Sequence, residues 1–186
     1  RVVGFVLPTR ELPRAAPSIE FVIGDATAPG GSGERVVAQI VNNRTSTWTP
    51  VGFPGAVKKR WPKAQGEFHA WATNRENLAL GRTHRSEVEP GLHLMSMVAQ
   101  AGFGASTVPR LRYEALRDCL RSVGHFAQER NASVHLPRIG TGQAGGSWPI
   151  IRDLIDRGGP IVTGDDLMRL AKASAGIGLG LKQRRR

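Results

Sequence analysis

The sequence predicts an α/β sandwich, in which a sheet is covered by helices on both faces. Short apolar runs of strand length alternate with segments of helical spacing along most of the chain. Glycine-rich turns follow several of these apolar runs, as is typical where strands give way to helices. A chain of 186 residues, 40% of them hydrophobic, also buries enough surface to fold without a metal or disulfide scaffold.

The first half of the chain contains apolar runs that predict strands. They cover residues 2–6, 19–23 and 36–41, with an extended, proline-containing connection between the first two. Two helices are expected next, over 53–61 and 65–73, separated by Pro62. Residues 79–88 and 92–98 alternate between apolar and polar types, which predicts two more strands joined by a turn at Gly91.

The second half begins with the clearest helix of the chain. Over residues 111–130 apolar side chains recur at a three-to-four spacing, which predicts one long amphipathic helix. A short strand over 134–136 enters a glycine-rich turn, and a helix follows over 148–155, with Ser147 as its expected N-cap and Pro149 in its first turn. Beyond it we expect a strand over 161–163 and a short helix over 166–173.

These elements predict one folded domain over residues 18–175, preceded by an extension over 1–17 and followed by a mobile, glycine-rich basic tail over 176–186. The chain carries 26 Lys and Arg against 15 Asp and Glu, a net charge of +11. Residues 18–156 contribute only +4, from 16 basic and 12 acidic side chains, whereas residues 157–186 contribute +5, from 7 and 2. The charge therefore predicts weak, salt-sensitive contact with nucleic acid through the tail rather than dedicated DNA recognition.

The numbers and spacing of the cysteine and histidine residues argue against disulfides and metal sites. Cys119 is the only cysteine, so no disulfide or multi-cysteine metal site forms within one chain, and a reducing, cytoplasmic location is expected. The five histidines show no metal-binding spacing, so we expect neither a metal nor another cofactor. No apolar run approaches the length of a membrane span, and the chain opens at Arg1 rather than at a methionine, as a processed or excised piece of a longer protein would.

The strongest local motif is a glycine-rich segment between the predicted strand 134–136 and the predicted helix 148–155. It is Pro-Arg-Ile-Gly-Thr-Gly-Gln-Ala-Gly-Gly over residues 137–146. Glycines expose main-chain N–H groups, and a helix N-terminus adds partial positive charge, so such a segment can cradle a phosphate or diphosphate without a basic side chain. A flexible surface turn is the alternative.

Polar residues follow two of the predicted strands. Gly24-Asp25-Ala26 comes after the strand 19–23, and Asn42-Asn43 comes after the strand 36–41. Ligands of α/β sheets collect at such strand ends, where Asp25 can accept a hydrogen bond from a ligand amine and Asn42 can hold sugar hydroxyls. Each residue can equally cap its own turn.

The order of these three motifs resembles the macrodomain family. A strand with Gly-Asp-Ala, a strand with Val-Asn-Asn and a strand with Pro-Arg-Ile-Gly-x-Gly follow one another across residues 18–156. Lys59-Arg60-Trp61-Pro62 and Tyr113-Glu114-Ala115-Leu116 add to the likeness. It is strongest toward the branch with bacterial ADP-ribose-binding proteins, DNA-linked ADP-ribose antitoxins and the hydrolase that removes terminal ADP-ribose from glutamate.

The resemblance implies a three-layer αβα sandwich with a mixed sheet of roughly six strands and an ADP-ribose cleft at the strand ends. Asp25, with the Ala26 main chain, would accept from the adenine amine, and Asn42 would hold the distal ribose. The main chain of the 139–142 turn and the 48–53 loop would enclose the diphosphate from opposite sides. The ligand-binding residues so implied are Asp25, Ala26, Asn42, Trp48, Gly52, Phe53, Ile139, Gly140, Thr141 and Gly142.

The chain departs from the family pattern where catalysis would take place. The loop over 43–53 lacks the usual run of glycines. Glutamate-specific relatives use a lysine and an aspartate where this chain aligns Gln100 and Ala144, which excludes a covalent lysine route. Two activities remain: metal-independent hydrolysis of ADP-ribosyl groups by a positioned water, with Asn42 and Gln100 as the catalytic candidates, and binding without cleavage.

A function of a different class also fits the charge. Lys58-Lys59-Arg60, Arg110, Arg112 and the basic tail would make a non-catalytic module that binds nucleic acid or poly(ADP-ribose). Its binding would weaken steeply with salt, whereas ADP-ribose held by main-chain amides and Asp25 would depend on salt much less.

Overall fold

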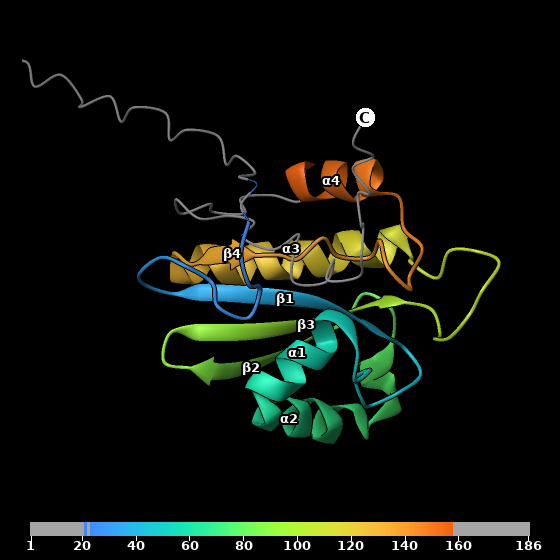
Figure 1. The fold of residues 1–186 in the computed structure, drawn as a ribbon, viewed down its shortest axis with the longest axis horizontal. Helices are drawn as coiled ribbons and strands as arrows, with labels where there is room; N and C mark the ends of the chain where they lie inside the picture. The colour runs from blue at the N-terminus through green and yellow to red at the C-terminus, as the bar shows by residue number, and fades with distance from the viewer. Residues whose placement is uncertain (1–20, 22, 158–186) are drawn as a thin grey trace, which may run out of the picture.

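The structure, a computed structural model, describes residues 21 and 23–157 as a sheet with helices on both faces (Figure 1). This confirms the predicted α/β sandwich. In chain order the elements are β1 (Arg35–Asn42), α1 (Gly52–Arg60), α2 (Pro62–Ala72), the 3-10 helix η1 (Arg75–Leu78), β2 (Thr83–Glu89), β3 (Leu92–Gln100), α3 (Tyr113–Arg130), β4 (Ser133–His135) and α4 (Trp148–Arg157).

The sheet is mixed, as expected. Its described strands follow the order β2-β3-β1-β4, with β1 parallel to both β3 and β4, and β2 antiparallel to β3. The carboxyl ends of β1, β3 and β4 therefore lie at the same edge of the sheet. Of the roughly six strands expected, four lie in the described part of the chain; the predicted strands 2–6 and 161–163, and most of 19–23, lie outside it.

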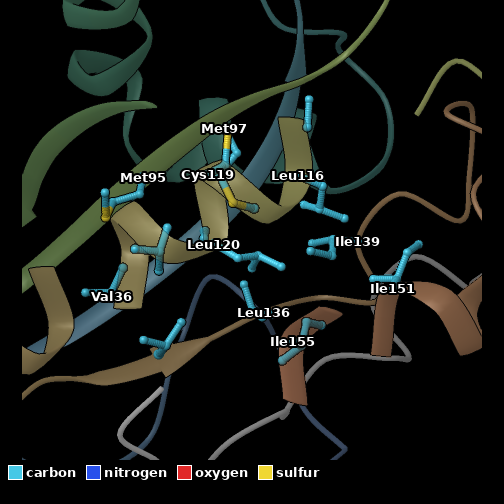
Figure 2. Packing of buried hydrophobic residues seen from close by; sticks show 14 of the residues in the cluster. Val36, Met95, Met97, Leu116, Cys119, Leu120, Leu136, Ile139, Ile151 and Ile155 are labelled. Atoms are coloured by element: carbon cyan, nitrogen blue, oxygen red, sulfur yellow. The ribbon is translucent and has the colours of Figure 1, made fainter. Parts of the chain in front are cut away.

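Each face of the sheet is covered by its own apolar core. Side chains from β1, β3 and β4 pack against α3 and α4 on one face, where Figure 2 shows Met97 beside Cys119 and Leu116. On the other face, β1 and β3 pack against α1 and α2 around Phe68. All nine residues of β3 are buried, because helices cover both of its faces and strands flank both of its sides.

Helix α3 confirms the predicted amphipathic helix but begins two residues later. All of the apolar side chains that predicted it are buried, and those within α3 share the face turned to the sheet. Leu111 instead forms an isolated antiparallel bridge with Gln100, and its N–H donates to the Ala144 carbonyl at 2.9 Å. The helix ends where Asn131 adopts a left-handed φ of 50°.

Two further boundaries differ from the predictions. Helix α2 starts at Pro62 rather than Gln65, because proline is well suited to the first turn of a helix and there loses no hydrogen bond. Strand β2 starts at Thr83 rather than residue 79. The preceding residues form a turn after η1, in which Gly81 has a φ of +92° and donates its N–H to the Val98 carbonyl at 2.9 Å.

The Lys59-Arg60-Trp61-Pro62 segment joins α1 to α2 and ties both to the end of β2. The Trp61 indole N–H donates to Glu89 Oε1 at 2.9 Å, and the Arg60 guanidinium lies 3.3 Å from the same oxygen and over the Trp61 ring. The hydrogen bond from Trp61, and then the charge of Arg60, hold the pKa of Glu89 below its ordinary value, against an opposing effect of burial.

Several predictions lie outside the described residues: the extension over 1–17, the helix over 166–173 and the tail over 176–186. Within the described range, no helix combines the length and the apolar character needed to cross a bilayer.

Candidate functional site

Three loops meet at the edge of the sheet where β1, β3 and β4 end. In Figure 1 they gather at the right-hand end of the sheet, as the cyan 43–51 loop, the yellow-green 101–112 loop and the orange 136–147 loop. The Asn43 carboxamide oxygen accepts from the Gly102 N–H at 2.9 Å, which joins the first two. The Ala144 carbonyl accepts from the Arg110 N–H at 2.8 Å, which joins the second to the third. The edge is therefore one connected structure.

The 136–147 loop is a closed turn rather than an extended strand-to-helix connection. The Gly140 carbonyl accepts from the Gly146 N–H at 2.8 Å, and Gly140 has a φ of +73° that favours glycine. Ile139 is buried beneath it. At Gly142, by contrast, an added Cβ would meet nothing within 4 Å, and the N–H donates to no described residue. The main chain at Gly142 is thus open to a ligand, as a phosphate cradle requires.

Asn42 caps the turn that follows β1. Its carboxamide oxygen accepts from the Arg44 N–H at 2.8 Å and the Thr45 N–H at 2.9 Å, and its nitrogen donates to Thr45 Oγ1 at 2.9 Å. The sequence allowed Asn42 either to hold sugar hydroxyls or to cap its own turn, and these contacts are those of a cap. Contact with a distal ribose stays a prediction, and it would require the ligand to compete with Thr45.

The 43–51 loop is clamped by side chains of α2 and η1. The Gln65 carboxamide accepts from the Trp48 N–H at 3.0 Å and donates to the Ser46 carbonyl at 3.2 Å, while His69 Nδ1 lies 2.9 Å from Ser46 Oγ. Arg75 donates to the Arg44 carbonyl at 2.8 Å. Sequence reasoning missed this clamp. The four-residue spacing of Gln65 and His69, which places both on one side of α2, is the signal that could have indicated it.

Trp48, Gly52 and Phe53 connect this loop to the apolar core under α1. The Trp48 side chain is 6% exposed, and its ring lies 5.5 Å from that of Phe68. Its indole N–H is buried without a partner among the described residues. Gly52 begins α1 with a φ of +68°, and Phe53 is partly buried against the same core. The Trp48 side chain is thus largely covered by the core, and its predicted contact with a ligand stays a prediction.

Asp25 and Ala26 lie in the segment that leads to β1. The Asp25 carboxylate accepts from the Thr27 N–H at 2.8 Å and from Thr27 Oγ1 at 2.9 Å, a local turn of the kind offered as the alternative to ligand binding. Ala26 is 1% exposed. Asn42, by contrast, pairs in register with Gln100 at the end of β3. Contact of Asp25 with a ligand at this edge stays a prediction.

Of the two catalytic candidates, Gln100 is the one whose side-chain oxygen can still accept a hydrogen bond. It is 8% exposed at the end of β3, and its nitrogen donates to the Gly102 carbonyl at 2.8 Å. No described residue donates to its oxygen. Ala144 is buried, and its carbonyl accepts from the Arg110 and Leu111 N–H groups.

The basic side chains proposed for nucleic-acid binding are mostly engaged within the domain. Arg110 donates to three carbonyls of the 101–112 loop, Arg112 donates to the Pro109 carbonyl at 2.9 Å, and Arg60 pairs with Glu89. Lys58 and Lys59 are exposed at the C-terminal end of α1. Across residues 23–157 no three His, Cys, Asp or Glu side chains gather closely enough to hold a metal ion.

Comparison with known proteins identifies the fold and the family. No family model matches the chain. The mouse chromodomain-helicase-DNA-binding protein 1-like is 28% identical over 139 residues, which are 70% of this chain but only 15% of that protein. A mutant macrodomain of Oceanobacillus iheyensis, solved with ADPR, has the same fold, with a TM-score of 0.60 and 19% identity over 86% of this chain and 89% of that one.

A solved macrodomain protein from Streptomyces coelicolor is similar in both sequence and structure. It is 37% identical, covers 74% of this chain and 88% of its own, and has a TM-score of 0.64. Identity at this level over most of both chains, together with the mixed sheet and its edge loops, extends the likeness beyond the fold. The chain therefore belongs to the macrodomain family.

Proposed function

We propose that this domain binds ADP-ribose, free or attached to a macromolecule, at the sheet edge formed by the loops 43–51, 101–112 and 136–147. The observation that carries the proposal is the parallel pairing of β1 with β3 and β4, which brings Asn42, Gln100 and the glycine turn to one edge. Ligands of α/β sheets bind at such edges. The macrodomain solved with ADPR supports the identity of the ligand.

Each part of the ligand has a group suited to it. The main chain over 139–142 receives the diphosphate, because the Gly142 N–H is unengaged by described residues and no side chain blocks its approach. Asp25 accepts from the adenine amine through the carboxylate oxygen that does not bind Thr27. Asn42 and Gln100, level with each other on β1 and β3, bind the hydroxyls of the distal ribose.

The finer part of the proposal is hydrolysis of the bond between ADP-ribose and its target. A water molecule would attack the anomeric carbon of the distal ribose, the bond to the target would break, and the water proton would pass to the released group. Gln100 supports this step better than Asn42, because its oxygen accepts no hydrogen bond from a described residue, whereas the Asn42 carboxamide is held by Thr45. Gln100 would orient the water rather than deprotonate it, since an amide is not a base at neutral pH.

Two measurements test the two parts separately. Calorimetry with ADP-ribose tests binding, and the absence of a binding signal would refute it. Incubation with ADP-ribosylated protein and with ADP-ribosylated DNA, followed by detection of released ADP-ribose, tests hydrolysis. Binding without release from either substrate would make the domain a reader.

The nucleic-acid alternative predicts a different dependence on salt and on the tail. Removing residues 181–186 should leave ADP-ribose affinity intact, and raising the ionic strength should weaken it only slightly, since main-chain donors supply most of the contacts. A steep loss of affinity in either experiment would favour the alternative.

A further inference from the structure

The Arg110 side chain binds three carbonyls of the 101–112 loop. Its guanidinium donates to the carbonyls of Ala101 at 3.1 Å, Gly104 at 3.2 Å and Ala105 at 2.9 Å. Its own N–H donates to Ala144, in the glycine turn, at 2.8 Å. Residues 101–109 contain no charged side chain, and the carbonyls of this segment fold around the Arg110 guanidinium.

By holding its loop, Arg110 also determines the position of Gly102. The Gly102 backbone lies against the guanidinium, since an added Cβ there would be 2.8 Å from Arg110 Nη1, and its φ is +72°. The Gly102 N–H donates to the Asn43 carboxamide at 2.9 Å. Gly102 is therefore fixed from two sides, by Arg110 of its own loop and by Asn43 of the neighbouring loop.

Gly102 in turn orients Gln100. The Gly102 carbonyl accepts from Gln100 Nε2 at 2.8 Å, so the amide nitrogen faces Gly102 and the oxygen faces the other way. No described residue donates to that oxygen. Because Gln100 pairs in register with Asn42, the oxygen lies at the edge of the sheet where β1 and β3 end.

We propose that Arg110 is a positioning residue, which holds Gly102 so that Gln100 presents its oxygen as an acceptor to a hydroxyl of the distal ribose. The inference rests on the proposed ADP-ribose function and assigns Arg110 a role within it. The geometry favours arginine, because Nε, Nη1 and Nη2 each donate to a different carbonyl, whereas lysine has a single nitrogen. A lysine keeps the charge but cannot hold the loop.

The test is a double-mutant cycle between Arg110→Lys and Gln100→Ala, with affinity measured by calorimetry for ADP-ribose and for ADP, which lacks the distal ribose. We expect each single variant to bind ADP-ribose about tenfold more weakly, as for one lost hydrogen bond, and the double variant to lose about tenfold as well. Affinity for ADP should stay at the wild-type value in all three. Arg121→Lys, the same substitution at an exposed arginine of α3 that pairs with Asp118, should change neither affinity.

Additive losses, or an Arg110→Lys variant that binds ADP-ribose like the wild type, would overturn the inference. Equal losses for ADP and ADP-ribose would also overturn it, because they would indicate a general loosening of the site. Hydrogen exchange at residues 101–105 provides a readout without ligand: it should speed up in Arg110→Lys but not in Arg121→Lys. Failure of the wild type to bind ADP-ribose would refute the proposed function itself, while unchanged exchange would refute the role of Arg110 even if ADP-ribose binds.

Discussion

Replacing Gly146 with alanine should destabilise the domain through the glycine turn. An added Cβ at this position would lie 2.8 Å from the Gly140 carbonyl oxygen and 3.0 Å from Ile151 Cδ1, and it would overlap Leu111 Cδ2. The carbonyl is itself bonded to the Gly146 N–H, and Leu111 and Ile151 are buried, so none of the three can move freely. Overpacking of this kind costs about 1 to 3 kcal/mol of unfolding free energy.

Gly142→Ala is the matched control for this experiment. An alanine Cβ at Gly142 would meet nothing within 4 Å, and neither glycine has a left-handed φ, so the two variants differ only in the space around the new methyl group. Urea denaturation followed by circular dichroism should therefore show a lower midpoint for Gly146→Ala. For Gly142→Ala the free energy of unfolding should be unchanged, or raised by up to about 1 kcal/mol because alanine restricts the unfolded chain. Equal stability of the two variants would refute the reasoning.

Three further outcomes are expected. Asp25→Ala should weaken ADP-ribose binding by about 1 to 3 kcal/mol in calorimetry. Asp25→Asn keeps an oxygen for Thr27, so it separates loss of the carboxylate from loss of the turn. Full affinity in both variants would exclude the adenine contact. The native state holds the Glu89 carboxyl at a pKa below its ordinary 4.5, so its contribution to stability is present above that pH and is lost as the pH falls through the lower native pKa. Trp61→Phe, which lacks the indole donor, should show a smaller loss of stability on acidification, measured as the urea midpoint against pH, and an unchanged loss would contradict the cause assigned to the shift. Burial, with a smaller effect of the Asp118 charge, raises the pKa of the Cys119 thiol to about 12, so a thiol reagent at neutral pH should label the chain only after denaturation; rapid labelling of the native protein would contradict the packing.

Local patterns in the sequence predicted the elements that depend on neighbours along the chain. The three-to-four spacing over 111–130 predicted α3, and the apolar run over 36–41 predicted β1, because the period of a helix or the length of a buried strand is a property of consecutive residues. The order of three short motifs also indicated the macrodomain family, which the similarity to the Streptomyces protein confirms.

Element boundaries were less predictable where a distant partner sets them. Residues 111 and 112 have helical spacing, yet α3 begins at Tyr113, because Leu111 forms a bridge opposite Gln100 and donates its N–H to Ala144 instead. Neither partner is near Leu111 in the sequence, so the helical pattern alone could not predict the change.

The tertiary structure decided what the polar and aromatic side chains of the site contact. From the sequence, Arg110 was a candidate for binding nucleic acid or poly(ADP-ribose), and Trp48 was a candidate ligand contact. In the fold, Arg110 binds the carbonyls of its own loop and Trp48 packs against Phe68. A residue type determines which bonds a side chain can form, but which bond it forms depends on how loops from separate strands fold over one another, and no local pattern encodes that.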